Sequence, residues 1–411
     1  MKRIVLIGNG FDLAHGLKTS YADFINWYWN NTIKALCTEK SNIWDDGLCR
    51  FNLLKNHSWK DSWKQYHFDI LNKEQIFSRI ESDSELFDVT YCTFYKRIKK
   101  QYETKGWVDI ENEYYALLTK YAIEEYSIQR MVELNTQLNI IKNKLVEYLN
   151  IIGKRPIPVN NEISERIYAP IKPIDISAQS QQFLKNMVDI WIDERRAIVK
   201  EKIHRYGLDE EEYTKYIDYF RENYKLGKCL YTDIPCAYLL PSSVMLLSFN
   251  YTPTAQLYHR EDISFINYIH GRATDNDTPQ SIIFGYGDEL DDKFKQLQNL
   301  NENECLRNIK SIKYLEADNY RQVMSFIESD LYQVYIMGHS CGQSDGTLLN
   351  TLFEHKNCIS IKPFYYQKED GTDNYMEIVQ NISRNFTDMK LMRDRVVNKT
   401  KCEALPQIKR K

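Results

Sequence analysis

The chain has 411 residues; 43% of them are hydrophobic, 27% are charged, and the formal net charge at pH 7 is −3. Such a length holds two or three average domains, or one large domain with an insertion. The composition is that of a folded globular protein. The small net charge excludes a general attraction to nucleic acid or to membranes, so any basic binding site must be local.

The cysteines and the apolar runs indicate a cytoplasmic protein. Nine cysteines occur without a C-x-x-C pair, and no histidine cluster has the spacing of a zinc site. This pattern is typical of reduced thiols rather than of a disulfide framework. The opening apolar run, residues 4–7, is too short for a signal peptide, and no run approaches the length of a membrane-spanning helix. We expect neither a bound metal nor a membrane segment.

The first sixteen residues have the pattern of a nucleotide-binding βα unit. The apolar run at residues 4–7 predicts a buried parallel strand, and Gly8-Asn9-Gly10 predicts a tight turn whose bare backbone a phosphate can approach. The segment from Asp12 would direct its first amides at that anion. This turn, together with Gly16, is only part of a dinucleotide fingerprint. The alternative is a plain strand-to-loop turn in an unrelated α/β domain.

The rest of the chain has a helical middle and a mixed C-terminal part. Apolar spacing of three or four predicts helices at residues 19–29, 109–126, 128–149, 177–200 and 209–224. From residue 236, apolar runs predict strands at residues 244–250, 264–269, 281–285, 332–338 and 358–364. Helical patterns separate several of these strands, at residues 290–300, 315–329, 347–354 and 374–386.

Strands that alternate with helices predict an α/β fold, with a Rossmann-like parallel sheet that carries helices on both faces. The first strand must join this sheet, because a single βα unit cannot bury its own faces. We therefore expect one Rossmann-like nucleotide-binding domain made of residues 1–30 and 236–390, interrupted by a large, mainly helical insertion at residues 31–235. The basic tail, residues 391–411, is expected to be frayed and solvated.

Ligands of open α/β sheets collect beyond the carboxyl ends of the strands. The residues that leave the predicted strands are mostly small or polar: Gly8, Asn9, Gly10, Phe11, Asp12, Asn250, Tyr251, Thr252, His270, Gly271, Gly285, Gly338, His339 and Ser340. We expect these exits to converge on one crevice.

Three of these exits have side chains suited to chemistry. Asn250 can hydrogen-bond a ribose or an amide, or it can simply cap a turn. His270 is the best candidate for a base, because neutral imidazole accepts a proton near pH 7, although a lone histidine beside a glycine is often structural. His339, Ser340 and Asp345 suggest a hydrolase, but the G-x-S-x-G frame is absent and the histidine shares the turn of the serine.

The insertion holds two further patterns. Asp109 and Glu113 are four residues apart and share one helical face, with Glu111 turned away. Such a pair can bind a divalent metal or ligand hydroxyls, but a solvated face near a helix N-terminus is the favoured interpretation. Arg50 and His57 have the R-x6-H spacing of some small ribonucleases, a pattern short enough to arise by chance.

Several of these islands resemble the bacteriophage abortive-infection AbiH family. They are residues 5–24 with the GNGFD turn, Trp107-Val108-Asp109-Ile110-Glu111, Ser248-Phe249-Asn250-Tyr251-Thr252, His270-Gly271, Gly338-His339-Ser340 and Ser344-Asp345. The likeness runs through almost the whole chain, and the GNGFD opening is its most specific part. It implies a role in defence against phage.

The same islands are more remotely similar to Sir2-like proteins, whose Rossmann-type domain binds NAD. That resemblance implies that Asn250 and His270 form a catalytic pair. It implies nucleotide contacts for Gly8, Asn9, Gly10, Phe11, Asp12, Gly16, Tyr251, Thr252, Gly271, Gly285, Gly338, His339, Ser340 and Asp345. Thr252 stands where an acidic residue is usual, and the zinc module has no counterpart, so deacylation is not expected.

Loss of nicotinamide from NAD leaves an oxocarbenium-like ribose. His270 suits the base beside that ribose, and Asn250 and Asp12 suit the group that holds the nicotinamide amide. We thus expect a cytoplasmic antiphage effector that binds and hydrolyses NAD or a related nucleotide, without a metal. The expected partners are this nucleotide, a phage-derived trigger protein and further copies of the chain, but no membrane or nucleic acid. The alternatives are a non-catalytic nucleotide-binding sensor or scaffold, and a nuclease.

Overall fold

The computed structural model describes residues 1–56, 58–106, 108–178, 239–273, 282–287 and 289–408, together with the single residues 180, 209, 211, 215, 218 and 222. The chain divides into two compact units. Unit 1 comprises Met1–Leu17, Arg155–Arg272 and Lys313–Lys411, and unit 2 comprises Lys18–Lys154 and Ala273–Ile312. The helices expected at residues 177–200 and 209–224 lie almost wholly outside the described residues. No helix of the described part is long and apolar enough to cross a membrane.

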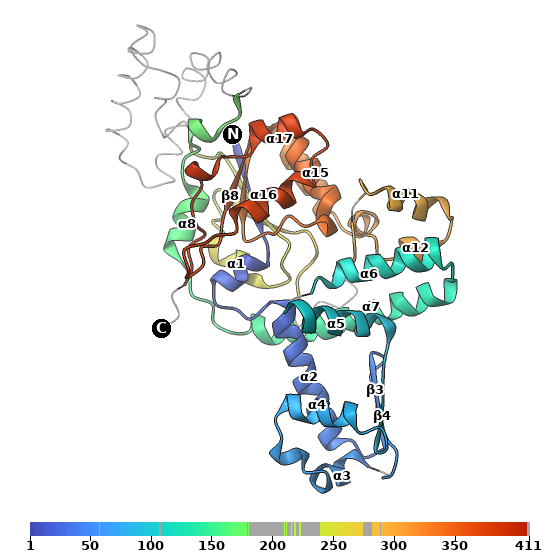
Figure 1. Cartoon of the computed structure of the whole chain (residues 1–411). Coiled ribbons are helices and arrows are strands. Elements are labelled where there is room, and N and C mark those ends of the chain that lie inside the picture. The colour runs from blue at the N-terminus through green and yellow to red at the C-terminus, as the bar shows by residue number, and fades with distance from the viewer. Residues whose placement is uncertain are drawn as a thin grey trace. The chain divides into compact units, whose positions relative to one another are not determined.

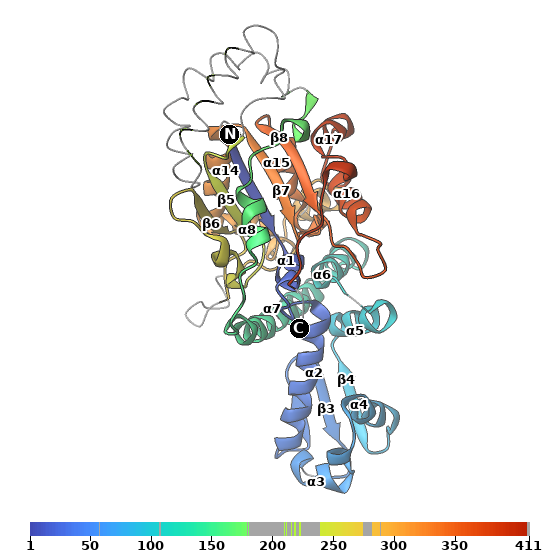
Figure 2. The same ribbon diagram turned by 90° about the vertical axis from the view of Figure 1, so that its left-hand side faces the viewer.

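Unit 1 contains a five-stranded sheet with the strand order β6-β5-β1-β7-β8, and all neighbouring strands are parallel (Figures 1 and 2). Its strands are β1 (Lys2–Ile7), β5 (Val244–Ser248), β6 (Ser264–Tyr268), β7 (Tyr332–Met337) and β8 (Cys358–Phe364). Each was expected within two residues of these bounds. The predicted Rossmann-like α/β class is confirmed.

The first strand lies at the centre of this sheet because its residues are apolar on both faces. Val5 pairs with Leu246 on one side and with Tyr335 on the other. Val5 and Ile7 belong to a core that α8 (Asn161–Tyr168) and α1 (Asn9–Ala14) cover. Figure 2 shows α8 in front of the sheet and α15 (Gly346–Glu354) behind it. Helices therefore cover both faces, as a parallel sheet requires.

Further helices of unit 1 pack at the two edges of the sheet. Helix α14 (Asn319–Ser329) contacts β6, and α16 (Tyr375–Ser383) and α17 (Met389–Arg395) contact β8. The chain beyond α17 returns to the sheet, since the Leu405 amide donates to the Tyr365 carbonyl at 2.8 Å. The Ile408 amide donates to the Ala14 carbonyl at 2.9 Å. The expectation of a frayed tail is therefore wrong as far as residue 408, because Leu405 is buried.

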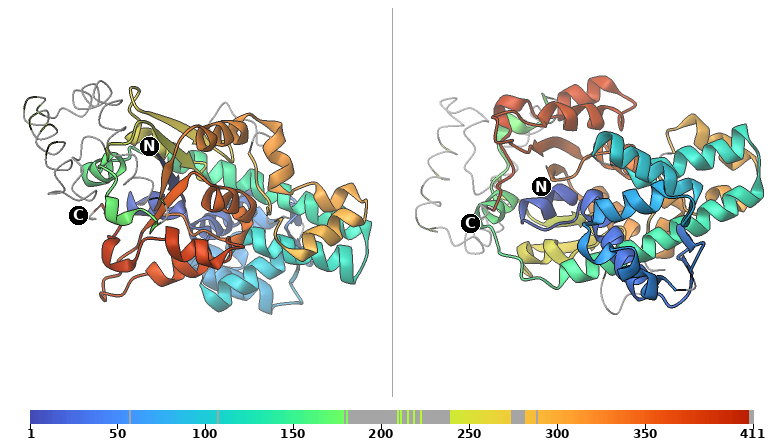
Figure 3. Two further views of the ribbon diagram at one scale, coloured as in Figure 1. Left: turned by 90° about the horizontal axis from the view of Figure 1, so that it is seen from above. Right: turned by 60° about the horizontal axis from the view of Figure 1, so that its bottom comes forward.

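Unit 2 is built around four helices, each of which packs against at least one of the others (Figure 3). They are α2 (Tyr21–Thr38), α5 (Thr93–Lys105), α6 (Ile110–Thr119) and α7 (Ile128–Gly153), joined by the shorter α11 (Asp292–Asn299) and α12 (Asn303–Leu306). The capping box of Ser20 and Asp23 starts α2.

Unit 2 also holds an antiparallel sheet that the sequence pattern did not predict. Its strands are β2 (Ile43–Asp45), β3 (Cys49–Leu53) and β4 (Phe87–Tyr91), accompanied by α3 (Trp59–Gln65) and α4 (Lys73–Ser82). Only alternate residues of β3 are buried, so its apolar content is too low to stand out from the polar helices around it. The glycine turn at Gly47, with φ at +85°, joins the first two strands.

One expected strand is not part of any sheet. Residues 282–285 lie in unit 2, and Tyr286 makes only an isolated bridge to Ile309. The prediction of a strand at residues 281–285 is wrong because its apolar side chains are buried by packing in unit 2 rather than by pairing with β-strands. The two units also divide the chain at other residues than the expected domains. Helix α2 and residues 273–312 belong to unit 2, and residues 155–178 to unit 1.

Candidate functional site

The exits of β1 and β7 pack backbone against backbone at the carboxyl end of the sheet. The Gly10 amide donates to the Gly338 carbonyl at 2.8 Å, and the Phe11 amide donates to the Gly8 carbonyl at 2.9 Å. Gly338 has φ at +76°, and a Cβ on it would lie 2.0 Å from the Phe11 nitrogen. These glycines are therefore required for close packing. The amides of Gly10 and Phe11, at the start of α1, are thus bonded within the chain.

The exit of β5 is tied to the same turn by two side chains. Asn250 Nδ2 donates to the Gly8 carbonyl at 2.9 Å, and Thr252 Oγ1 donates to Asp12 Oδ2 at 2.6 Å. Asp12 is buried, and this burial raises the pKa of its carboxyl to about 6, while the bond from Thr252 opposes the rise. Asn250 thus connects two strand exits, which is a structural role whether or not it also contacts a ligand.

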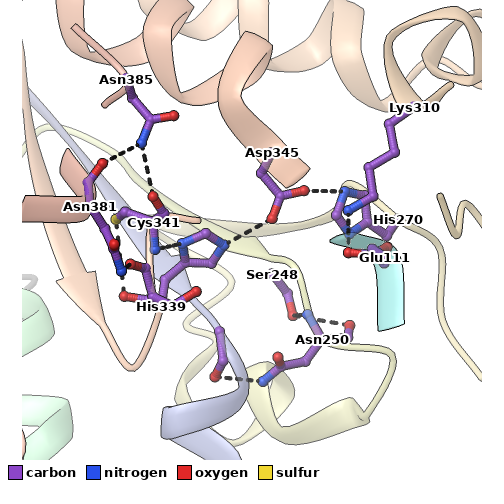
Figure 4. Close-up of polar contacts among 12 residues, drawn as sticks. Glu111, Ser248, Asn250, His270, Lys310, His339, Cys341, Asp345, Asn381 and Asn385 are labelled. Carbon is purple, nitrogen blue, oxygen red and sulfur yellow. Dashed lines mark hydrogen bonds and ion pairs between the residues drawn. The ribbon is translucent and has the colours of Figure 1, made fainter. Parts of the chain in front are cut away.

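A carboxylate between two histidines lies at the exits of β6 and β7 (Figure 4). Asp345 Oδ1 is 3.3 Å from His270 Nε2, and Asp345 Oδ2 is 3.5 Å from His339 Nε2. Asp345 ends the single 3-10 turn η9 (Gln343–Asp345) that leads into α15. The three side chains come from positions 69 and 6 residues apart along the chain, and the parallel strands bring them together.

The proton of His339 is fixed by the loop after β7. The Cys341 amide donates to His339 Nδ1 at 3.0 Å, so Nδ1 is an acceptor. A neutral imidazole carries its proton on the other nitrogen, and His339 therefore presents Nε2–H to Asp345. The other oxygen of Asp345, Oδ1, can only accept a hydrogen bond, so the His270 nitrogen that faces it, Nε2, carries the proton. Nδ1 is then the basic nitrogen of that ring.

Aromatic rings pack around this cluster, and its three side chains are buried. His270 is 3% exposed, His339 5% and Asp345 8%. The Phe249 ring lies 4.1 Å from the His339 ring and 5.4 Å from the His270 ring, measured between centroids. The Tyr314 hydroxyl is 3.4 Å from His270 Nε2. Charges act more strongly on one another in such a low-dielectric setting than in water, which suits a base held by a carboxylate.

The other candidate residues of the sequence fall into three groups. Tyr251 lies near the cluster, with its ring centroid 6.4 Å from that of His270. Asn9, Gly16 and Ser340 are exposed, and Gly16 and Gly271 have positive φ values that turns require. Gly285 lies in unit 2, so it is not one of the strand exits of the sheet, contrary to expectation. The sequence analysis missed Tyr314, which carries no motif of its own.

The acidic motif of the insertion forms a different cluster, within unit 2. Asp109 caps α6 by accepting from the Asn112 amide at 3.1 Å, and Glu113 pairs with Arg97 at 2.8 Å, as the favoured interpretation of a helix N-terminus requires. Glu111 pairs with the buried Lys310 at 2.9 Å. It also accepts from the Gly285 amide at 3.2 Å. Glu111 is thus turned into unit 2 and holds the segment after residue 282 against α6.

Two remaining points concern metals and the ribonuclease spacing. In the part of the chain that the structure describes, no group of three or more His, Cys, Asp or Glu side chains is arranged to hold a metal ion. Arg50 is exposed on β3, whereas His57 lies outside the described residues, as does Trp107.

Comparison with protein families gives a match over most of the chain. The family model described as "Bacteriophage abortive infection AbiH" matches residues 4–367. Neither the search of curated proteins nor the search of solved structures finds a match. The matched range includes every residue of the histidine cluster and of the turn after β1.

Proposed function

The chain belongs to the bacteriophage abortive infection AbiH family and so has a role in abortive infection, and from this premise we propose that it hydrolyses NAD or a related nucleotide at its N-glycosidic bond. One observation carries the proposal: Asp345 orients His270 at the carboxyl end of a parallel sheet. In α/β proteins of this kind, that edge is where nucleotides bind. A buried histidine held by a carboxylate is the usual form of a general base that works near neutral pH.

The reaction needs one proton transfer to the protein. Water attacks the ribose carbon that carries the nicotinamide, and the carbon–nitrogen bond breaks with its electron pair moving to nicotinamide. His270 takes the proton that the water loses, and the products are nicotinamide, ADP-ribose and that proton. Asp345 stabilises the imidazolium while it exists. Asn250 and Asp12, on the neighbouring strand exits, are the groups we assign to the nicotinamide amide.

The glycine turn after β1 does not explain how the phosphates of the nucleotide would be bound. The amides of Gly10 and Phe11 are already bonded to chain carbonyls, so they do not form the phosphate cradle. We therefore assign no phosphate contact to these two amides, and we assign the glycines to packing. A nucleoside with a good leaving group, rather than its diphosphate, is the part of the substrate that the cluster addresses.

Replacing His270 tests the proposal. Purified protein, alone and with extract of phage-infected cells, is incubated with NAD, and released nicotinamide is followed by mass spectrometry. His270→Ala should lower the rate by about a hundredfold or more, the usual contribution of a general base. His355→Ala is the matched control, because His355 also pairs with a carboxylate, Glu328 at 3.1 Å, but lies before β8 at the amino end of the sheet. Equal turnover by His270→Ala and wild type would contradict the proposal.

The burial of the cluster favours one other function, a nucleotide-binding sensor without chemistry. His270, His339 and Asp345 are each less than a tenth exposed. A sensor would bind NAD or ADP-ribose in calorimetry and give no product in either condition above. Product formation that depends on His270 excludes it.

A further inference from the structure

The loop after β7 contains a backbone conformation that its residue type rarely adopts. Cys341 has φ at +56°, in the left-handed region that favours glycine, and it is fully buried. A residue other than glycine is strained in this region, and such positions cluster at functional sites. Something in the fold must therefore hold Cys341 in this conformation.

Two asparagines fix this conformation: Asn381 in α16 and Asn385 just after it. Asn385 Nδ2 donates to the Cys341 carbonyl at 2.8 Å and to the Asn381 carbonyl at 2.9 Å. Asn381 Nδ2 donates to the Ser340 carbonyl at 2.8 Å. Asn385 is fully buried, so its bond to the Cys341 carbonyl is shielded from water (Figure 4). The carbonyls of Ser340 and Cys341 are thus held by α16 and the turn that follows it.

The left-handed turn has one consequence for the neighbouring histidine. With its carbonyl held by Asn385, Cys341 directs its amide back at His339 Nδ1, 3.0 Å away. An amide is only a donor, so it selects the tautomer of His339 that has its proton on Nε2. That proton faces Asp345 Oδ2. The carboxylate thereby keeps one oxygen for His339 and the other for His270.

We propose that His339 is a positioning residue: the Cys341 amide fixes its tautomer, and its Nε2–H holds Asp345 in the rotamer and the charge state that orient His270. The claim that this matters for turnover rests on the proposed function, whereas the tautomer itself does not. Residues that orient a metal-binding histidine from behind change activity by tenfold to a hundredfold, and we expect an effect of similar size for a residue that orients a base. His339 itself need not touch the substrate.

The thiol of Cys341 has no part in this arrangement. Burial raises the pKa of the Cys341 thiol well above its usual range, which disfavours the thiolate that a nucleophile requires. Its Sγ lies 4.0 Å from the His339 carbonyl oxygen, at the limit of a weak contact. The residue therefore acts through its backbone amide.

Two amide substitutions of His339 separate its two contacts. In His339→Gln the terminal NH2 takes the place of Nε2 and still reaches Asp345, whereas in His339→Asn the side-chain oxygen takes the place of Nδ1 and accepts only from Cys341. We expect His339→Gln to retain nicotinamide release within about threefold of wild type, and His339→Asn to lose on the order of tenfold to a hundredfold in kcat. Equal rates for the two variants, or the reverse order, would overturn the proposal.

A second readout does not depend on turnover. Nuclear magnetic resonance of the full chain with isotope-labelled histidine reports which ring nitrogen carries the proton. The expected result is an Nε2–H tautomer for neutral His339. For neutral His270 we expect the Nε2–H tautomer in wild type and His339→Gln, but a mixture of both tautomers in His339→Asn. Among the described residues, Asp345 and the Tyr314 hydroxyl both approach His270 Nε2.

The outcomes distinguish the two proposals. An Nδ1–H tautomer for His339 overturns the positioning role even if the enzyme is active. The expected tautomers of His339 and His270, in a protein that leaves NAD intact, support the positioning role and reject the proposed function. If either variant does not fold, as judged by its thermal midpoint, the wild-type tautomer alone decides.

Discussion

Each unit of the protein buries charged side chains in its interior, and the two clusters differ in what they can do. In unit 2, Glu111 meets Lys310 at 2.9 Å and also accepts from the Gly285 amide. In unit 1, Asp345 lies between His270 and His339. A carboxylate and an ammonium neutralise each other permanently, whereas imidazoles exchange protons near pH 7. Only the second cluster is able to move a proton during a reaction.

The contrast shows that a buried acidic motif is not by itself a site. Glu111 is part of the WVDIENE sequence that attracts attention as a candidate metal or hydroxyl ligand. Its two oxygens instead join three segments of unit 2. Breaking such a pair leaves an uncompensated charge, which is why it is more consequential for stability than for chemistry.

The largest expected effect concerns the carboxylate of the histidine cluster. Asp345→Asn replaces one acceptor oxygen by an NH2 group, which disfavours the Nε2–H tautomer of the histidine that it faces. We expect nicotinamide release to fall by about a hundredfold or more while the thermal midpoint changes little. Glu328→Gln, at the partner of His355, is the control and should keep full turnover. A fully active Asp345→Asn protein would remove the distinction between the two clusters.

The next effect tests the structural role of the other cluster. Lys310→Met removes the ammonium that neutralises Glu111, and we expect unfolding to be easier by about 3–5 kcal/mol, as for other broken buried pairs. The double variant Glu111→Gln/Lys310→Met should regain most of this loss, because no buried charge is left. Denaturant unfolding of the full chain measures both. If Lys310→Met is as stable as wild type, the ion pair between Glu111 and Lys310 does not stabilise the fold in this way.

How much of this organisation the sequence predicts depends on the range of the contacts involved. The sheet strands are runs of buried apolar residues, so local composition reveals them. Residues 282–284 are equally apolar and equally buried, but they pack in unit 2, and only tertiary structure distinguishes the two cases. The strands of unit 2 are short and half polar. Their pairing across residues 43–91 depends on contacts that no local pattern encodes.

In the candidate site, too, the sequence reveals some features, and others depend on tertiary contacts. Sequence position identifies His270, His339 and Asp345 one by one, because they follow predicted strands or the turn after one. It does not show that one carboxylate serves both rings, since that depends on distances between separate strand exits. The partners Asn385 and Tyr314 lie on helical turns elsewhere in unit 1 and have no motif. For Glu111, the decisive partner Lys310 is 199 residues away.

A smaller effect concerns the buried carboxyl of Asp12 in α1. Burial raises the pKa of Asp12 to about 6, above its ordinary value of 3.8. A carboxyl whose pKa is raised by folding binds its proton more tightly in the folded state. Its contribution to the free energy of unfolding is therefore complete below pH 3.8 and is lost as the pH rises through 6. We expect Asp12→Asn to remove this loss and to stabilise the protein at pH 7 by up to roughly 3 kcal/mol relative to wild type. Thermal midpoints between pH 4 and pH 7 measure it, with the exposed Asp262→Asn as control. An unchanged pH profile in Asp12→Asn would contradict the assignment.

The smallest expected effect concerns the thiol of the strained loop. Cys341→Ala keeps the backbone amide that reaches His339 and removes only the sulfur. Turnover should stay within about threefold of wild type, and the loss of stability should be about 1 kcal/mol, typical of a small buried truncation. A loss of turnover as large as that of Asp345→Asn would instead assign chemistry to the thiol.

The most direct measurement of the central claim is the fate of the water oxygen. NAD is incubated with the full chain, with and without extract of infected cells, in water enriched in the heavy oxygen isotope, and the products are weighed by mass spectrometry. The account predicts nicotinamide without the label and ADP-ribose with one labelled oxygen, formed by the wild type and lost in His270→Ala. Intact NAD in every condition, or labelled ADP-ribose formed equally by His270→Ala, would contradict it.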